Sequence, residues 1–182
     1  MLKPLLETER LILREIVSAD EEALFEMDAD PEVHRFLGNK PVENKEQVKE
    51  VIKMIQQQYK DNGIARWAVI NKNSNEFMGW CGLKLYKQKI NGHINFYELG
   101  YRFNKKHWGK GYATESGKAC VNYGFEALNL KEIYGMTDSR NLNSNKVLLK
   151  LGFKYIEKFD FEGDESDWFK LTRNDWNNKL KN

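Results

Sequence analysis

Apolar and polar residues alternate along the chain in two ways, one typical of strands and the other of amphipathic helices. Strand-like segments are residues 8–16, 66–71, 77–86, 97–103, 131–137, 155–159 and 167–171. Helical spacing begins near residues 18, 44, 112 and 142, and a short helical turn is expected over residues 33–37. The order β-α-α-β-β-β-α-β-α-β-β predicts an α/β domain with a mixed sheet and helices on both faces.

Capping residues mark where two of these helices begin and end. Asn44 together with Gln47 predicts the start of one helix, and Gly63 predicts its end. Asn141 predicts the start of the last helix, and Gly152 lies just beyond its end. These residues therefore fix the boundaries that the apolar pattern alone leaves open.

Composition narrows the class of protein. The 182 residues include 29 Lys and Arg against 27 Asp and Glu, a net charge of +2, whereas a nucleic-acid binder normally needs a stronger basic surface. No apolar run approaches the roughly 20 residues that cross a membrane, and the charged start is no signal peptide. The isolated Cys81 and Cys120 suit buried thiols in a reducing cytosol. We expect a single cytoplasmic domain, residues 1–182, without nucleic acid or membrane partners.

The most informative segment is a strand that leads through a basic, glycine-containing loop into a helix. Gly109 and Gly111 lie in the loop after the strand at 97–103. Positive charge around them comes from Lys105, Lys106 and Lys110. Backbone N–H groups at a helix N-terminus bind anions, and glycine lets the main chain approach a bulky ligand. The spacing is neither that of a P-loop nor that of a dinucleotide fold, and two close glycines alone often form only a turn. In this context the unit predicts a cradle for a phosphorylated ligand.

Two motifs carry a family resemblance. They are Lys106-x-x-Gly109-x-Gly111-Tyr-Ala-Thr-Glu115 and Asn141-x-x-Ser144-x-x-x-Leu-x-Lys150-Leu-Gly-Phe153. Together they resemble the GCN5-related N-acetyltransferase (GNAT) superfamily and, within it, the RimJ/RimL type. Residues 6–14 also resemble the first strand of that type. The chain departs from the pattern at Lys106, where the superfamily usually has Arg or Gln, but this position is thought to act mainly through its backbone.

The resemblance implies a mixed, mostly antiparallel sheet of about seven strands, splayed between residues 97–103 and 131–137. Gly100 is a candidate for a bulge or a close approach at the splay. The resemblance also implies acetyl-CoA as co-substrate, no metal ion, and direct transfer in a ternary complex. The acceptor would be a protein N-terminal α-amine or a small-molecule amine. Paired subunits are common in similar enzymes, so a homodimer is compatible with the resemblance.

Cofactor-binding positions carried over from the family fall in the strand, the glycine loop and the last helix. They are Leu99, Gly100, Tyr101, Arg102, Lys106, His107, Trp108, Gly109, Lys110, Gly111, Tyr112, Ala113, Asn141 and Ser144. The strand would pair with the pantetheine through its backbone, and the amides of residues 107–112 would hold the phosphates.

Three residues are candidates for the chemistry. By position, the Leu99 N–H would stabilise the oxyanion of the tetrahedral intermediate. Glu98, on the opposite face, is a candidate base acting through water, or else an ion-paired strand carboxylate. Ser144 corresponds to the proton donor proposed for the RimJ/RimL type, or else it only satisfies the first turn of its helix. Leu148 stands where many members have a tyrosine acid, so that role does not carry over.

The acceptor side is less defined by the sequence. Aromatic residues that could wall a pocket or belong to the core are Trp67, Trp80, Tyr86 and Tyr97. Acidic residues that could attract a cationic amine or simply be solvated are Glu162, Asp164, Glu165 and Asp167. The histidines His34, His93 and His107 are too scattered to predict a metal site. A second interpretation stays open: a non-catalytic acyl-CoA-binding or regulatory module that keeps the cradle but lacks a competent acid.

Overall fold

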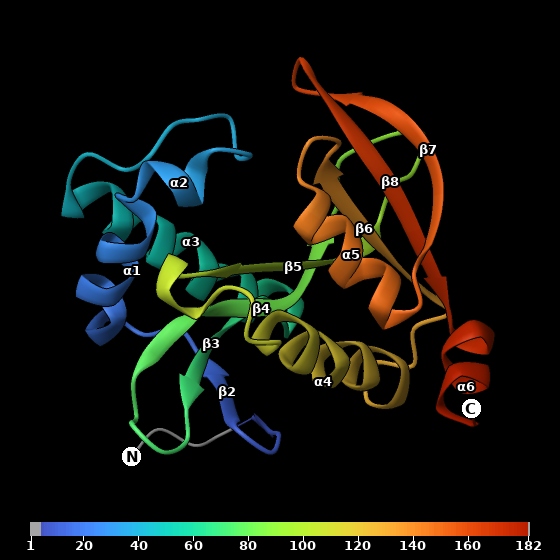
Figure 1. Cartoon of the computed structure of the whole chain (residues 1–182), viewed down its shortest axis with the longest axis horizontal. Helices are drawn as coiled ribbons and strands as arrows, with labels where there is room; N and C mark the ends of the chain where they lie inside the picture. Colours follow the sequence, from blue (N-terminus) through green and yellow to red (C-terminus); the bar gives the residue numbers. More distant parts are fainter. Residues whose placement is uncertain (1–4, 182) are drawn as a thin grey trace.

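The computed structural model describes residues 5–181 and contains one eight-stranded sheet with the order β1-β2-β3-β4-β5-β6-β8-β7 (Figure 1). The strands are β1 (Leu6–Glu7), β2 (Leu11–Glu15), β3 (Arg66–Asn71), β4 (Phe77–Tyr86), β5 (Phe96–Phe103), β6 (Glu132–Asp138), β7 (Lys154–Phe161) and β8 (Asp164–Thr172). Neighbouring strands are antiparallel except β5 and β6, which are parallel. The predicted mixed, mostly antiparallel sheet is confirmed, and the very short β1 adds one strand to it.

Helices cover both faces of this sheet, because apolar side chains line both. The helices are α1 (Glu21–Asp28), α2 (Pro31–His34), α3 (Lys45–Asn62), α4 (Tyr112–Glu126), α5 (Leu142–Leu151) and α6 (Arg173–Lys181). Two short 3-10 turns, η1 (Ser18–Asp20) and η2 (Lys105–His107), precede α1 and α4. The core beneath α1 and α3 includes Leu24, Val48, Ile52 and Ala68. The core beneath α4 and α5 includes Leu83, Leu99, Val121, Phe125 and Leu151.

Helix boundaries follow the capping residues. The Asn44 side chain accepts from the Gln47 N–H at 3.1 Å and the Gln47 side chain accepts from the Asn44 N–H at 3.3 Å, which forms a capping box. Gly63 ends α3 in the left-handed region, with φ of +71°. At α5 the Asn141 side chain accepts from the Ser144 N–H at 3.2 Å. These boundaries agree with the sequence-based expectations.

The last helix, α6, was not expected from the sequence. Its residues are mostly polar, and Trp176 is the buried residue among them. The Trp176 ring packs 6.4 Å from the Phe125 ring of α4, centroid to centroid. The Asp175 N–H donates to the Thr172 hydroxyl at 3.2 Å, which satisfies a backbone donor in the first turn. Tertiary contacts thus stabilise a helix that has no apolar face of its own.

The two parallel strands diverge immediately after they meet. A single residue pair, Glu98 with Tyr134, joins β5 to β6, whereas the β4–β5 register runs unbroken from Tyr86–Phe96 to Gly79–Phe103. The predicted splay is therefore present, but Gly100 is not a bulge. It is instead a close-approach position, because a Cβ there would lie 2.9 Å from the Arg66 Nε.

Candidate active site

The loop between β5 and α4 has the backbone of an anion-binding site. Gly109 and Gly111 have φ of +73° and +83°, in the left-handed region that favours glycine. Gly111 is the N-cap of α4, and no side chain within residues 5–181 caps this helix end. The first N–H groups of α4 therefore lack a side-chain partner where the helix dipole favours negative charge. A Cβ on Gly109 would meet nothing within 4 Å, so this glycine serves the conformation of the loop rather than close packing.

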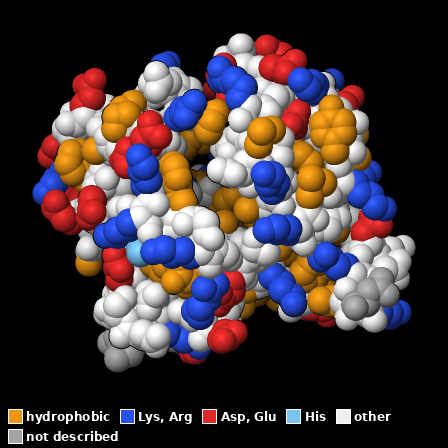
Figure 2. Space-filling model, in the orientation of Figure 1, with side chains coloured by type: hydrophobic (Ala, Val, Ile, Leu, Met, Phe, Trp, Pro, Cys, Tyr) orange, Lys and Arg blue, Asp and Glu red, His pale blue; other side chains and the backbone are white. Residues whose placement is uncertain are grey.

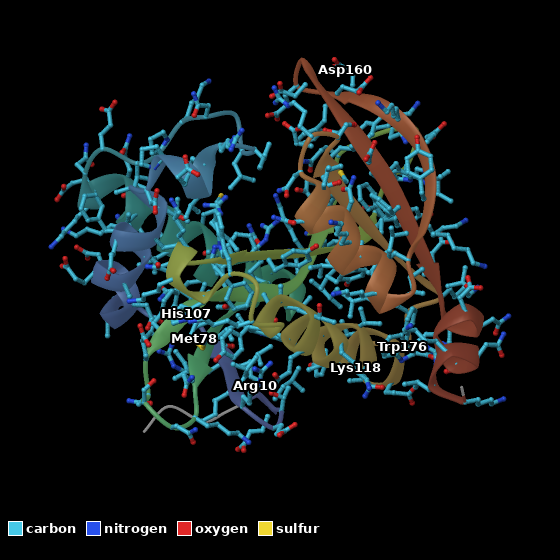
Figure 3. All side chains as sticks on the ribbon, in the orientation of Figure 1. Arg10, Met78, His107, Lys118, Asp160 and Trp176 are labelled. Carbon is cyan, nitrogen blue, oxygen red and sulfur yellow. The ribbon has the colours of Figure 1, made fainter. Side chains whose placement is uncertain are left out.

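Arg10, which lies just before β2, supports this loop, and the sequence analysis did not single it out. Its Nη1 donates to the Lys110 carbonyl at 3.1 Å, and its guanidinium lies 4.4 Å from the centre of the Tyr112 ring. Its Nε donates to the Glu115 carboxylate at 2.6 Å. Glu115 is the acidic residue of the first turn of α4, so this ion pair offsets a negative charge that would repel an anion. Figure 3 shows Arg10 and His107 on the same side of the molecule, near the start of α4.

Three further loop residues hold the loop in place. The Lys106 Nζ lies 2.8 Å from the Glu76 carboxylate, so its charge is already paired. His107 is buried with its Nε2 3.4 Å from the same carboxylate, and burial lowers the pKa of this histidine. The Trp108 Nε1 donates to the Phe103 carbonyl at 2.8 Å, which ties the loop back to the end of β5. This arrangement leaves the backbone N–H groups of the loop as the groups that could bind a ligand.

A pair of hydroxyl groups bridges β5 and α5 on the face that carries α4. The Tyr101 hydroxyl lies 2.9 Å from the Ser144 Oγ and 3.0 Å from the Ser144 carbonyl oxygen. When the Tyr101 O–H donates to this carbonyl, the Ser144 O–H is free to donate to the tyrosine oxygen. Burial raises the pKa of Tyr101, so its hydroxyl stays protonated. Asn141 caps the same turn of α5, and Leu99 packs in the neighbouring core. The structure therefore brings Tyr101, Asn141 and Ser144 together.

Glu98 lies on the other face of β5. It is 5% exposed, and its Oε2 lies 3.2 Å from the Arg66 Nη2. Burial raises the pKa of Glu98, and the positive charges of Arg66 and Lys84 oppose this shift only in part. A carboxyl with a raised pKa is a better proton acceptor near neutral pH than an ordinary glutamate. Because β5 and β6 separate next to Glu98, the sheet is open at this point and its two faces are connected there.

The predicted acidic cluster of the β7–β8 hairpin is not one open surface. Asp167 is buried and accepts hydrogen bonds from two side chains. Asp164 lies 3.7 Å from Arg140, and Glu165 pairs with Lys158. Figure 3 shows Asp160 near the tip of the same hairpin. Most of the acidic charge is therefore compensated locally, as in a solvated turn.

The candidate aromatic residues divide between core and site. Trp67 is 2% exposed and packs edge-on against Tyr123, so it belongs to the core. Trp80 is half-buried and lies between two guanidinium groups, with its ring centroid 4.7 Å from Arg66 and 5.1 Å from Arg102. The Arg102 side chain also donates to Asp28 at 2.8 Å. Arg66 and the side chain of Arg102 are features of this face that the sequence analysis missed.

The histidines lie apart. His34 lies 3.8 Å from Asp28, whereas His93 stacks on Trp168 with a centroid separation of 5.3 Å. No group of three or more side chains suited to a metal ion occurs within residues 5–181. Over the same residues, no helix has both the length and the apolar character needed to span a bilayer.

Known proteins resemble the chain in both sequence and fold. The model of the acetyltransferase (GNAT) domain matches residues 10–154. An uncharacterized N-acetyltransferase, YoaA of Bacillus subtilis (strain 168), is 38% identical over 154 residues, covering 83% of each chain. Two solved structures share the fold: the ribosomal-protein-S5-alanine acetyltransferase of Vibrio fischeri (TM-score 0.74, 21% identity, 94% and 97% coverage) and the spermidine N-acetyltransferase of Vibrio cholerae in complex with CoA and spermine (TM-score 0.74, 19% identity, 93% and 99% coverage).

The split sheet, the uncapped helix end and these matches define the class of protein as an acyltransferase that acts on amines. The chain belongs to the GNAT acetyltransferase family and is an N-acetyltransferase.

Proposed function

We propose that the protein transfers the acetyl group of acetyl-CoA directly to a primary amine, with both substrates bound at the same time. The observation that supports this most is the split between β5 and β6, with an uncapped α4 N-terminus on one side and Glu98 on the other. The buried Cys81 and Cys120 lie within the core and not at the split, so no thiol is placed to carry the acetyl group.

The residues of the α4–α5 face fit acetyl-CoA. The amides of residues 107–112 lie in the loop and first turn where an anion is favoured, and they would hold the phosphates. From Leu99 onward, the backbone groups of β5 that point away from β4 have no strand partner on β6. They can therefore pair with an extended pantetheine arm. Asn141 and Ser144 would contact this arm from α5. Because Arg10 binds Glu115, the acidic residue in the first turn of α4 has its charge compensated.

Each candidate residue then has a defined task. Glu98 accepts the proton of the incoming amine, through water, from the face opposite the cofactor. The Leu99 N–H stabilises the negative charge that develops on the thioester oxygen. The Ser144 hydroxyl, held by Tyr101, donates a proton to the departing thiolate. The Tyr101–Ser144 hydroxyl pair would take the role of the tyrosine that other family members have at the position of Leu148.

The alternative is a module that binds acyl-CoA without turning it over. The replacement of the tyrosine by Leu148 favours that alternative, whereas the Tyr101–Ser144 hydroxyl pair favours catalysis. Proteins of the same fold include a ribosomal-protein-S5-alanine acetyltransferase and a spermidine N-acetyltransferase. The RimJ/RimL type, a cytoplasmic location and a homodimer remain predictions of this proposal.

A thiol-release assay with acetyl-CoA and a panel of amines tests the proposed function, alongside calorimetric titration with CoA. If the protein is a transferase, it should bind CoA and release thiol only when an amine is present. Mass spectrometry should then detect the N-acetylated product. Tight CoA binding with no release in the presence of any amine would identify the non-catalytic module.

A further inference from the structure

We propose that the acceptor is a small molecule with a carboxylate close to its amine, as in a free amino acid, and that Arg66 and Arg102 bind this carboxylate. The inference rests on the proposed function, because it describes the second substrate of the same reaction. It concerns only the face of the sheet opposite α4.

On that face three side chains, Arg66, Trp80 and Arg102, form a row beside Glu98. The Arg66 Nη2 lies 3.2 Å from the Glu98 carboxylate, and the guanidinium groups of Arg66 and Arg102 lie 4.7 and 5.1 Å from the centre of the Trp80 ring. Gly100 lies between Glu98 and Arg102 on β5, and a Cβ there would meet the Arg66 Nε at 2.9 Å. The missing side chain at position 100 thus gives the Arg66 guanidinium its place next to the candidate base.

This row carries an excess of positive charge. Arg66, Lys84 and Arg102 face the carboxylates of Asp28 and Glu98, so positive charge exceeds negative even when both carboxylates are ionised. The Lys84 pKa is lowered by burial and then by Arg66, which outweighs the attraction of Glu98 and of the more distant Glu162. An anionic group on the acceptor would complement this excess, whereas a purely cationic acceptor would increase it.

Both guanidinium groups are already oriented in a way that suits binding of a carboxylate. Stacking on Trp80 and the ion pairs with Glu98 and Asp28 fix their orientation before any ligand arrives. About a fifth of each arginine side chain remains exposed, 19% for Arg66 and 20% for Arg102. Because the planar fork of arginine matches a carboxylate at two points, such pre-ordered guanidiniums bind carboxylates well.

A pocket at the mouth of this face suits a small acceptor. It has a volume of about 330 Å³ and is lined by Arg35, Gly38, Asn39, Arg140 and Asp164. Figure 2 shows a hollow between the part formed by α1–α3 and the part formed by α5 and β6–β8, with Lys and Arg side chains on both sides. Arg35 follows His34, which lies 3.8 Å from the Asp28 that binds Arg102. One side of the pocket is therefore formed by the segment that directly follows His34, beside the Asp28–Arg102 ion pair.

The contact between Glu98 and Arg66 also limits the distance between the two groups of the acceptor. An amine at Glu98 and a carboxylate at the neighbouring Arg66 have to be separated by only a few bonds. α-Amino acids meet this condition. A polyamine lacks the anion, and a peptide N-terminus has an amide where the free amino acid has its carboxylate.

The test compares matched acceptors in the thiol-release assay: several free amino acids, their primary amides, and spermidine. For the wild-type protein we expect kcat/KM for the preferred amino acid to exceed that for its amide by about tenfold or more. The α-amine of an amino acid amide loses its proton more easily than the α-amine of the free amino acid. Amine reactivity alone would therefore favour the amide as acceptor. Arg102→Gln should raise the KM for the amino acid and reduce its advantage to about threefold or less, with the Kd for CoA unchanged. Arg102→Lys, which keeps the charge but not the fork, should give an intermediate preference.

Lys53→Gln is the matched control, because it removes one positive charge from an exposed site on α3 where Lys53 pairs with Glu50. It should leave the preference intact. The inference would be overturned, with acetyl transfer still in place, by any of three results. These are an equal kcat/KM for the amino acid and its amide, a higher kcat/KM for spermidine, or an equal decrease in kcat/KM for the amino acid and its amide in Arg102→Gln. Failure of every acceptor to release thiol, despite CoA binding, would overturn the proposed function itself and this inference with it.

Discussion

The two faces of the sheet near the split present different kinds of chemical group, backbone amides on one and side chains on the other. On the α4–α5 face the proposed binding groups are backbone amides: the glycine loop, the uncapped helix end and the unpaired half of β5. On the opposite face they are side chains, namely Glu98, Arg66, Trp80 and Arg102. A backbone site tolerates many substitutions and suits one constant cofactor, whereas a side-chain site changes with each residue and suits acceptors that vary. Variants on one face should therefore affect one substrate only.

The largest expected effect comes from the candidate base. Glu98→Gln should lower kcat by about 10²–10⁴-fold while the Kd for CoA stays the same, because general base catalysis is lost but the cofactor face is intact. The wild-type rate should rise with pH as Glu98 ionises, at a pH above the usual glutamate range because burial raises its pKa. This rise should be missing from the pH profile of the variant. Glu50→Gln, on the exposed side of α3, is the control; an unchanged profile in Glu98→Gln would remove Glu98 from the mechanism.

The glycine loop should give the complementary result. Gly109→Val should raise the Kd for CoA by about 10–100-fold, because a β-branched residue is strained at φ of +73° and the loop must change shape. Gly92→Val is a matched control: Gly92 has φ of +78°, and like Gly109 it has no atom within 4 Å of an added Cβ. Titration calorimetry of both variants separates loss of the loop from general strain. Equal CoA affinities in the two variants would contradict the phosphate cradle.

The hydroxyl pair that bridges the split should have a smaller effect. Ser144→Ala and Tyr101→Phe should each reduce kcat by about tenfold, and the double variant should lose little more than either alone, because the groups act together. Steady-state kinetics at saturating acetyl-CoA and thermal unfolding would be measured for all three. A fully active Ser144→Ala protein would leave the serine with only its place in the first turn of α5.

Replacement of Arg10 should weaken CoA binding modestly, by an amount that depends on the salt concentration. Arg10→Gln releases the charge of Glu115 at the start of α4, so we expect the Kd for CoA to rise by several-fold in low salt. Because Arg10 is exposed, with 42% of its side-chain surface accessible, the effect should shrink at high ionic strength. Arg10→Lys should recover part of the affinity. An identical Kd at every salt concentration would mean that Arg10 supports the fold alone.

The smallest effect concerns stability and pH. The folded-state pKa of Glu98 is raised, so the folded protein holds this proton more tightly than the unfolded chain does. The stability that Glu98 contributes is then present at pH below the unfolded pKa and is lost as pH rises through the folded value. Relative to Glu98→Gln, the wild-type Tm should therefore increase as pH falls from 8 to 5. A difference in Tm that does not change with pH would place Glu98 in an ordinary environment.

The sequence predicted the parts of the protein that depend on local patterns. Asn44, Gly63, Asn141 and Gly152 mark helix ends through contacts within a few residues, and the glycine loop is one continuous segment. The parts that it missed depend on distant residues. Arg10 meets Glu115 across 105 positions, and Arg66 meets Glu98 across 32. Neither pairing leaves a periodic signal, and α6 depends on the buried Trp176 and on the contacts of Arg173 and Asp175 with distant residues.

Amide hydrogen exchange with and without CoA tests the central claim, that the cofactor lies in the split with its phosphates on the glycine loop. The account predicts that CoA slows exchange in residues 107–113 and 99–102, and leaves the segment around Arg35 unchanged. Protection confined to α1 and α2, with no change in the glycine loop, would contradict it.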